Sequence, residues 1–438
     1  MRTLGACWHC VFQRDGCPDD GNPCKRCVDK AKRGQLRYIP CNRDKLVILV
    51  HDFLPPSMTD MHQKQTIEDY VKANIVHFYQ DKPVKVELTS GYGPPMIWDL
   101  YEFKPTDTGE PLRQLQYFQN PDTRLVESRM KRSPPLGLLK LETGDDDRFD
   151  EYLQRLLNPI NLWDFGWTCF EEETQINTFQ AALLQAICTL YTETQDIDLK
   201  SVLEKVLRMM LVTYIMAHTL TISEDTVDNV ERAVRHSRPL ALPQPRSVSG
   251  PHARHISPRL ANRQLKFFFS LKRNKICEDI LNWLQQTFHN SGKEETWLAS
   301  FCTMLGLAMA LEEFQRTLWI QADAKIRKGE KSAAVAEEEA SNACGRIDVR
   351  FDLLVGLFQC KYRRKGWTYG SFGPQTPQLN GEENAPGRKF LAEVHGLLLD
   401  ERQHLESRRQ YPLEKQYQCF CTTRLVARFL LPFLGLST

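Results

Sequence analysis

Apolar residues recur every three or four positions along most of the chain, a spacing that places them on one face of an α-helix. The first such stripe occupies residues 58–79, and the clearest ones occupy residues 176–190 and 199–210. Further stripes predict helices in the second half of the chain, near residues 265–284, 297–319, 351–357, 390–405 and 422–431. The pattern therefore predicts a mostly α-helical body.

One segment departs from the helical spacing. Val84, Val86 and Leu88 alternate with polar neighbours, which is the two-residue period of a strand with one buried face. A turn-forming run at residues 90–95 separates this strand from a second apolar stretch at residues 97–103. Two such runs joined by a turn rich in Gly and Pro predict a small β-hairpin.

Composition changes abruptly at residues 235–262, where five prolines stand among serines and arginines. Such a stretch buries too little apolar surface to fold alone, so we expect a linker. A chain of 438 residues is expected to form two or three domains at about 150 residues each. The boundaries that follow are an N-terminal module at 1–54, a mixed then helical middle region at 55–234, the linker at 235–262 and a helical C-terminal region at 263–438.

The overall composition is that of an ordinary water-soluble protein, with 42% hydrophobic and 26% charged residues. No run reaches about eighteen apolar residues, the length from which a membrane-spanning helix is suspected. The longest candidate, residues 206–222, contains Arg208 and His218 and therefore predicts a buried helix. We expect no membrane partner.

The most specific chemical pattern lies in the first 41 residues, which hold six of the fourteen cysteines. Their spacing is C-x2-C-x6-C-x6-C-x2-C-x13-C, formed by Cys7, Cys10, Cys17, Cys24, Cys27 and Cys41. Each C-x2-C pair lets two thiolates reach one tetrahedral ion at about 2.3 Å. No apolar stretch of the signal-peptide type follows Met1, and the other cysteines lie among apolar residues, as reduced core cysteines do. We therefore expect a metal site rather than disulfides.

The cysteines allow two metal arrangements. The four thiolates of the two C-x2-C pairs can complete one zinc ribbon, which leaves Cys17 and Cys41 unused. Six thiolates can instead hold two zinc ions if two of them bridge, because two tetrahedral ions need eight ligand positions. The spacing alone leaves both arrangements open.

The module resembles the fungal Zn2Cys6, or binuclear zinc-cluster, family of DNA-binding transcription factors. The resemblance rests on the run CWHCVFQRDGC, the loop PDDGNP with Pro23 at its turn, the pair CKRC and the sixth cysteine. It implies two zinc ions and six ligands, with Cys7 and Cys24 as bridges, Cys10 and Cys17 on the first ion, and Cys27 and Cys41 on the second. The last gap, thirteen residues, is longer than is usual in that family.

The same resemblance places DNA-reading residues in the loop after Cys10. Arg14 falls where the family has a base-reading side chain, and an arginine grips the O6 and N7 atoms of guanine with two hydrogen bonds. Gln13 would add a contact to adenine. The loop holds this one basic residue only, and its Asp15 would repel phosphates if it faced them.

Positive charge is concentrated on the module. Residues 1–50 carry ten Lys or Arg and five Asp or Glu, a net charge of +5, so the remaining 388 residues sum to −3 in a chain of +2. Such a surface suits contact with DNA phosphates. The predicted phosphate-contacting residues are Lys25, Arg26, Lys30, Lys32, Arg33 and Arg37. A solvated basic surface that offsets the thiolate charge is the alternative.

The chain contains no G-x-S-x-G, H-E-x-x-H, P-loop or dinucleotide motif, so we do not expect an enzyme. We expect a zinc-dependent, sequence-specific DNA-binding transcription regulator of the RNA polymerase II type, located in the nucleus. Its cluster would bind a short GC-containing site, and its helical body would be regulatory. The implied partners are double-stranded DNA, coregulator proteins and a second copy of the chain in a homodimer.

Two alternatives stay open. The first is a zinc-stapled protein-interaction scaffold without selective DNA binding, which the sparse basic loop and the long last gap favour. The second is an enzyme with its site in the helical body and a structural metal, because residues distant in sequence can assemble a site. Zinc-dependent, sequence-selective DNA binding that needs Arg14 would distinguish the regulator from both.

Overall fold

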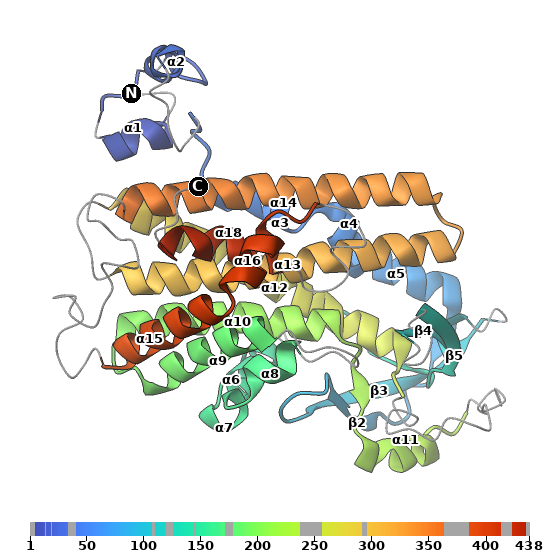
Figure 1. Cartoon of the computed structure of the whole chain (residues 1–438). Helices are drawn as coiled ribbons and strands as arrows, with labels where there is room; N and C mark the ends of the chain where they lie inside the picture. The colour runs from blue at the N-terminus through green and yellow to red at the C-terminus, as the bar shows by residue number, and fades with distance from the viewer. Residues whose placement is uncertain are drawn as a thin grey trace.

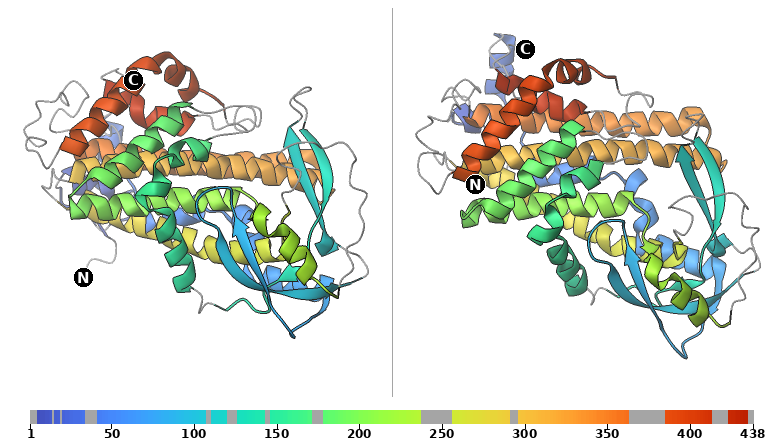
Figure 2. Two further views of the ribbon diagram at one scale, coloured as in Figure 1. Left: turned by 90° about the horizontal axis from the view of Figure 1, so that it is seen from below. Right: turned by 60° about the horizontal axis from the view of Figure 1, so that its bottom comes forward.

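The computed structural model describes residues 5–13, 15–18, 20–33, 41–106, 110–119, 126–142, 146–170, 178–236, 256–290, 296–362, 385–412 and 423–434. Long helices lie side by side in the body, the strands gather at one end, and a small module with two short helices stands at the other end (Figure 1, Figure 2). The predicted fold class is confirmed, since the protein is mostly helical with a small antiparallel sheet.

The body is built on long helices. They are α9 (Thr178–Glu193), α10 (Ile197–Ala217), α12 (Arg259–His289), α13 (Trp297–Arg327) and α14 (Ala333–Tyr362). The central helix is α13, which contacts α10, α14 and the C-terminal helix α18 (Arg424–Leu430). Buried residues follow one another along α13 without an exposed face over its first four turns, as expected of a helix in the middle of a core.

By length and composition alone, α13 is apolar enough to cross a membrane. Within the protein, however, 94% of its most apolar window is buried among other elements. A core helix passes the same test, because packing inside a protein and contact with lipid both favour apolar residues all round. The helix is therefore weak evidence for a membrane span.

Shorter helices pack around this body, and those of the 3-10 type are marked η. The first group is η1 (Leu46–Leu49), α3 (Val50–Phe53), α4 (Pro56–Thr59), η2 (Asp60–His62) and α5 (Lys64–Asn74). The middle region adds η3 (Glu110–Leu112), α6 (Asp146–Leu156), α7 (Pro159–Leu162), α8 (Phe165–Phe170), η5 (Glu224–Thr226) and α11 (Val227–Ala233). The last group is α15 (Ala385–Asp400), α16 (Arg402–Arg409), α18 and η11 (Leu431–Leu434).

The predicted hairpin is confirmed as β2 (Val84–Thr89) and β3 (Met96–Pro105), which pair antiparallel. The alternation of β2 buries Val84, Val86 and Leu88. Three strands that sequence reasoning missed extend the sheet: β1 (Ile75–Phe78), β6 (Leu136–Gly137) and β7 (Thr221–Ile222). A separate antiparallel pair consists of β4 (Arg113–Gln119) and β5 (Val126–Arg132).

Residues 58–79 do not form the single helix that their apolar spacing predicts. The segment contains the end of α4, then η2 and α5, and the chain becomes strand β1 at Ile75. The β1 run, Ile-Val-His-Phe, is rich in residues that favour strands and pairs with β3. Pairing with a neighbouring strand therefore overrides the helical spacing at these four residues.

The division of the chain into four regions stays a prediction. Residues 237–255, most of the predicted linker, lie outside the described residues, and α12 begins at Arg259, inside the predicted linker range. One hydrophobic core includes residues from Trp8 to Phe433. The regions before and after the predicted linker therefore share a core.

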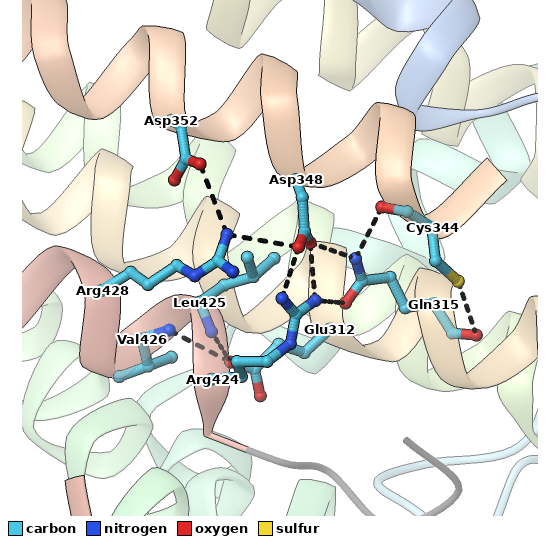
Figure 3. Close-up of polar contacts among 9 residues, drawn as sticks. All are labelled: Glu312, Gln315, Cys344, Asp348, Asp352, Arg424, Leu425, Val426 and Arg428. Atoms are coloured by element: carbon cyan, nitrogen blue, oxygen red, sulfur yellow. Dashed lines mark hydrogen bonds and ion pairs between the residues drawn. The ribbon is translucent and has the colours of Figure 1, made fainter. Parts of the chain in front are cut away.

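A buried polar network attaches α18 to the long helices (Figure 3). The guanidinium of Arg424, which is fully buried, pairs with the carboxylate of Asp348 in α14, and its Nη2 lies 2.6 Å from Oδ1. The same Nη2 donates to the side chain of Gln315 in α13 at 3.1 Å. Gln315 in turn donates to Asp348 at 2.7 Å. Each charge in this network therefore has an opposite charge or a hydrogen-bond partner within the core.

Glu312 of α13 satisfies the first turn of α18. Its carboxylate accepts hydrogen bonds from the backbone N–H groups of Thr423 at 2.8 Å, Leu425 at 2.7 Å and Val426 at 3.0 Å. The first N–H groups of a helix have no partner within the helix itself. The side chain of Gln180 donates a further bond at 2.7 Å. Burial raises the pKa of Glu312, and these hydrogen bonds act against that rise.

Gly306 marks a close approach of α13 to α10. A Cβ atom at this position would lie 2.2 Å from Cγ1 of Val206. We expect Gly306→Ala to destabilise the protein by about 1–3 kcal/mol, as overpacking of a filled core does. Gly396→Ala in α15 is the control, because nothing lies within 4 Å of its Cβ position, and it should stabilise by about 0.5–1 kcal/mol. Urea unfolding measures both, and equal midpoints would contradict the tight contact.

Candidate metal centre and nucleic-acid interface

Two short helices position the cysteines of the module. Cys7 directly precedes α1 (Trp8–Gln13), and Cys10 lies in its first turn. Cys24 is the N-cap residue of α2 (Lys25–Lys32), and Cys27 lies in its first turn. Residues three apart lie on the same side of a helical turn, so each C-x2-C pair presents both thiols in one direction.

The six thiols gather in one cluster. The sulfur atoms of Cys7 and Cys24 are 3.9 Å apart, and those of Cys7 and Cys27 are 3.6 Å apart. Two groups form in which all ligand atoms lie within 4.8 Å of one another: Cys7, Cys10, Cys17 and Cys24 in the first, and Cys7, Cys24, Cys27 and Cys41 in the second. Each group can supply the four ligands of one tetrahedral ion, and the groups share two members.

The two halves of the module repeat the same contacts. The backbone N–H of Cys7 donates to the sulfur of Cys17 at 3.4 Å, and the backbone N–H of Cys24 donates to that of Cys41 at 3.2 Å. In each half, the first cysteine thus contacts the third. Such donors favour the ionised form of a thiol. Cys17 and Cys41, which a single four-thiol ribbon leaves unused, therefore belong to the cluster.

Most of the cluster is shielded from solvent, since five of the six cysteines are buried and Cys41 is half-buried. Burial, followed by hydrogen bonding to neighbouring thiols, raises the pKa of Cys10 and of Cys27. Burial raises the pKa of Cys41 to about 11. At Cys24 burial acts in the same direction, but hydrogen bonds from its neighbours lower its pKa to about 7. A cation among the sulfurs would favour the ionised form of every thiol.

The predicted DNA-contacting residues lie mostly on α2. Lys25 and Lys32 are exposed on this helix, and Arg33 is exposed directly after it. Gln13 is exposed at the end of α1. Arg14 and Arg37 lie outside the described residues. An exposed basic surface therefore lies along α2 and directly after it.

Asp15 turns toward α2. Its carboxylate pairs with Lys30 at 3.0 Å and with Arg26 at 3.4 Å. The hydrogen bond from Lys30 lowers the pKa of Asp15. Two of the predicted phosphate-contacting side chains are thus paired with an acid of the module itself. Sequence reasoning missed this contact because it joins the two halves of the cluster across the loop.

The module rests on the last turns of α12. The side chain of Trp8 is buried, its ring centre lies 4.4 Å from that of His289, and its Nε1 donates to the carbonyl of Asp44 at 3.0 Å. The backbone N–H of Leu46 donates to the side chain of Gln285 at 2.7 Å. Sequence reasoning assigned no role to Trp8, although a tryptophan in a small polar module is a signal for such docking.

Fold and site together define a mostly helical protein whose N-terminal module holds a cluster of cysteines suited to bind metal ions. Residues 53–429 match the family model of the KpeA transcription factor, and the chain belongs to this family. The protein is therefore a transcription regulator by family membership. Comparison with curated proteins and with solved structures finds no match. The matched range begins after the cysteine module, so the family assignment rests on the body.

Proposed function

We propose that the protein is a zinc-dependent, sequence-selective DNA-binding regulator of RNA polymerase II transcription that acts in the nucleus. The observation that carries this proposal is the arrangement of six thiols in two groups of four with two shared members. Two bridged tetrahedral ions need this number and sharing of ligands. Membership of a transcription factor family supports a role on DNA.

Zinc fits the donor set. Tetrahedral sites made of thiolates select zinc or iron–sulfur clusters, and the C-x2-C spacing is typical of structural zinc. The buried residues that pack among themselves inside the module are all cysteines. A metal would therefore replace the apolar core that the module lacks, and its binding would supply the folding free energy.

The proposed DNA contacts come from α2 and the end of α1. Lys25, Lys32 and Arg33 would contact phosphates, and Gln13 with Arg14 would contact base edges. The net charge of +5 over residues 1–50 supports this assignment. Coregulator proteins or a second copy of the chain would bind the helical body. The proposal requires no catalysis, and a non-enzymatic role stays a prediction.

A zinc-stapled interaction scaffold is the second candidate. The pairing of Asp15 with Lys30 and Arg26 favours it, because these contacts compete with binding of phosphates by both cations. The scaffold predicts two bound zinc ions and only weak, non-selective DNA binding.

Selection of random duplex DNA by the zinc-loaded full-length protein tests the proposal. We expect enrichment of a short GC-containing site and its loss in Arg14→Ala, since a bidentate arginine–guanine contact contributes about 1–3 kcal/mol to base discrimination. Lys32→Ala should instead weaken binding to all sequences alike and reduce its salt dependence. Lys140→Ala, an exposed lysine of the body, is the control and should change neither.

Enrichment of no sequence while two zinc ions remain bound would contradict the DNA-binding role and favour the scaffold. Loss of zinc in Arg14→Ala would show that the substitution disturbs the fold of the module. In that case Gln13→Ala replaces it as the test of base contacts.

A further inference from the structure

Two cationic side chains are buried on one face of α12. Lys266 is 9% exposed and Arg273 is 2% exposed. They are seven positions apart, which is about two helical turns and places both on the same face. The helix packs against α10, α13 and η2. Burial of a charge is costly unless an opposite charge or hydrogen bonds compensate it.

Compensation of these two charges is incomplete in the described part of the chain. The Lys266 ammonium donates to the carbonyl oxygen of Met216, near the end of α10, at 2.8 Å. The Arg273 guanidinium lies 5.3 Å from the ring centre of Phe314 in α13. Its Nε and Nη2 atoms are buried and have no hydrogen-bond partner among the described residues. Neither cation has a carboxylate partner among these residues.

Arg263 and His62 lie near the two buried cations. Arg263 lies one turn before Lys266, and its Nε donates to the carbonyl oxygen of Met61 in η2 at 3.4 Å. The next residue, His62, is half-buried, and its Nδ1 lacks a partner among the described residues. Burial, followed by the charges of Lys266, Arg273 and Arg263, lowers the pKa of His62 to about 3. Burial and Arg273 lower the pKa of Lys266 to about 8.

Another buried cation of the same body has a carboxylate partner, which Arg273 lacks among the described residues, although its Nε is also without a hydrogen-bond partner there. Arg424 has both oxygens of Asp348 and the side-chain oxygen of Gln315 as partners (Figure 3). The contrast with Arg273 is informative, because a buried polar group without a partner calls for an explanation. Groups whose pKa is strongly shifted by burial and by like charges also concentrate at functional sites.

We propose that α12 and η2 form a binding site for a small anion with carboxylate or phosphoryl oxygens. The Nε–H and Nη2–H groups of Arg273 are the parallel pair that a guanidinium offers to two oxygens of one anion. The Lys266 ammonium adds a point charge two turns away. His62 of η2, whose buried Nδ1 also lacks a partner among the described residues, adds a further polar group to the site.

The helix that carries these cations also contacts the cysteine module. Gln285 and His289, in the last turns of α12, contact Leu46 and Trp8. Along the helix, His289 lies about 24 Å from Arg273, at 1.5 Å per residue. An anion at this site is therefore placed to act as an effector of the module. This effector role rests on the proposed function, whereas anion binding does not.

Titration of the full-length, zinc-loaded protein with inorganic phosphate and, separately, with succinate tests the site. Both titrations are followed by calorimetry at constant ionic strength with chloride as the balancing anion. We expect saturable binding of at least one probe, and an affinity lower by roughly tenfold or more in Arg273→Met and in Lys266→Met. The probe that binds more tightly distinguishes a phosphoryl ligand from a carboxylate ligand.

Lys272→Met is the matched control on the same helix. Lys272 pairs with Asp150 of α6 at 2.6 Å. The Lys272→Met protein should therefore bind the probes with the affinity of the wild type. Thermal unfolding without anion adds a second measurement, in which Lys266→Met should be at least as stable as the wild type because a buried like-charge repulsion is removed. Saturable binding of neither probe, or an equal loss of affinity in Lys272→Met, would overturn the site.

DNA affinity with and without the saturating probe tests the effector role. A change in the wild type that is absent from Arg273→Met supports this role, and an unchanged affinity overturns it while the binding result stands. Failure of the protein to select any DNA sequence would count against the proposed function alone, because the calorimetric titrations contain no DNA.

Discussion

Replacement of Cys24 by alanine is expected to remove both zinc ions from the module, because this cysteine belongs to both groups of four thiols. Cys17 belongs to one group only, so Cys17→Ala is expected to retain one ion. Structural zinc in zinc-finger peptides binds with roughly 10–16 kcal/mol, which is also folding free energy. Cys24→Ala should therefore unfold the module and abolish zinc-dependent DNA binding. Native mass spectrometry of the full-length protein counts the ions.

Cys360→Ala is the control for this experiment, since Cys360 lies in α14 outside both groups, and two ions should remain. One ion retained by Cys24→Ala would show that this thiol is not shared. Two ions retained by Cys17→Ala would remove Cys17 from the ligand set. A single ion in the wild type, unaffected by Cys17→Ala, is the result that a four-thiol ribbon predicts.

Local signals explain what could be predicted from the sequence. The six cysteines are recognisable because thiol chemistry and residue spacing are visible without knowledge of the fold, and the structure brings all six together. The helical body is recognisable because apolar residues at helical spacing indicate a buried face wherever that face packs. The β2–β3 hairpin combines strand alternation with a turn signal. Zinc itself and the DNA contacts stay predictions.

Contacts between distant segments explain what could not be predicted. Strand β1 forms because β3 lies beside it, and the four residues of β1 do not indicate which segment they pair with. The sequence shows Asp15 only as an acidic residue in a basic module, and its pairing with Lys30 of α2 becomes visible only in the fold. Arg273 and Arg424 look like solvent-facing residues of helices, since a long charged side chain is normally exposed. Their burial follows from how the helices pack, and their different partners give them different roles.

Asp348→Ala is expected to destabilise the body by about 3–5 kcal/mol, because it leaves the fully buried guanidinium of Arg424 without its paired carboxylate. The side chain of Gln315 would remain as a neutral acceptor, at 3.1 Å from Nη2 in the intact network. A neutral acceptor does not replace the charge that the carboxylate supplies, so the cost of burying the cation stays largely uncompensated. Urea unfolding monitored by tryptophan fluorescence measures the loss.

The matched control is Asp279→Ala in α12, where the carboxylate pairs with Lys275 at 2.8 Å on the surface. Such an exposed pair contributes at most about 1 kcal/mol, because water screens it. The double variant Asp348→Leu with Arg424→Met removes both buried charges and should recover most of the loss, as apolar replacement of a buried pair often does. Equal losses in Asp348→Ala and Asp279→Ala would mean that packing alone attaches α18. The family match ends at residue 429, inside α18, so the network lies within the matched region.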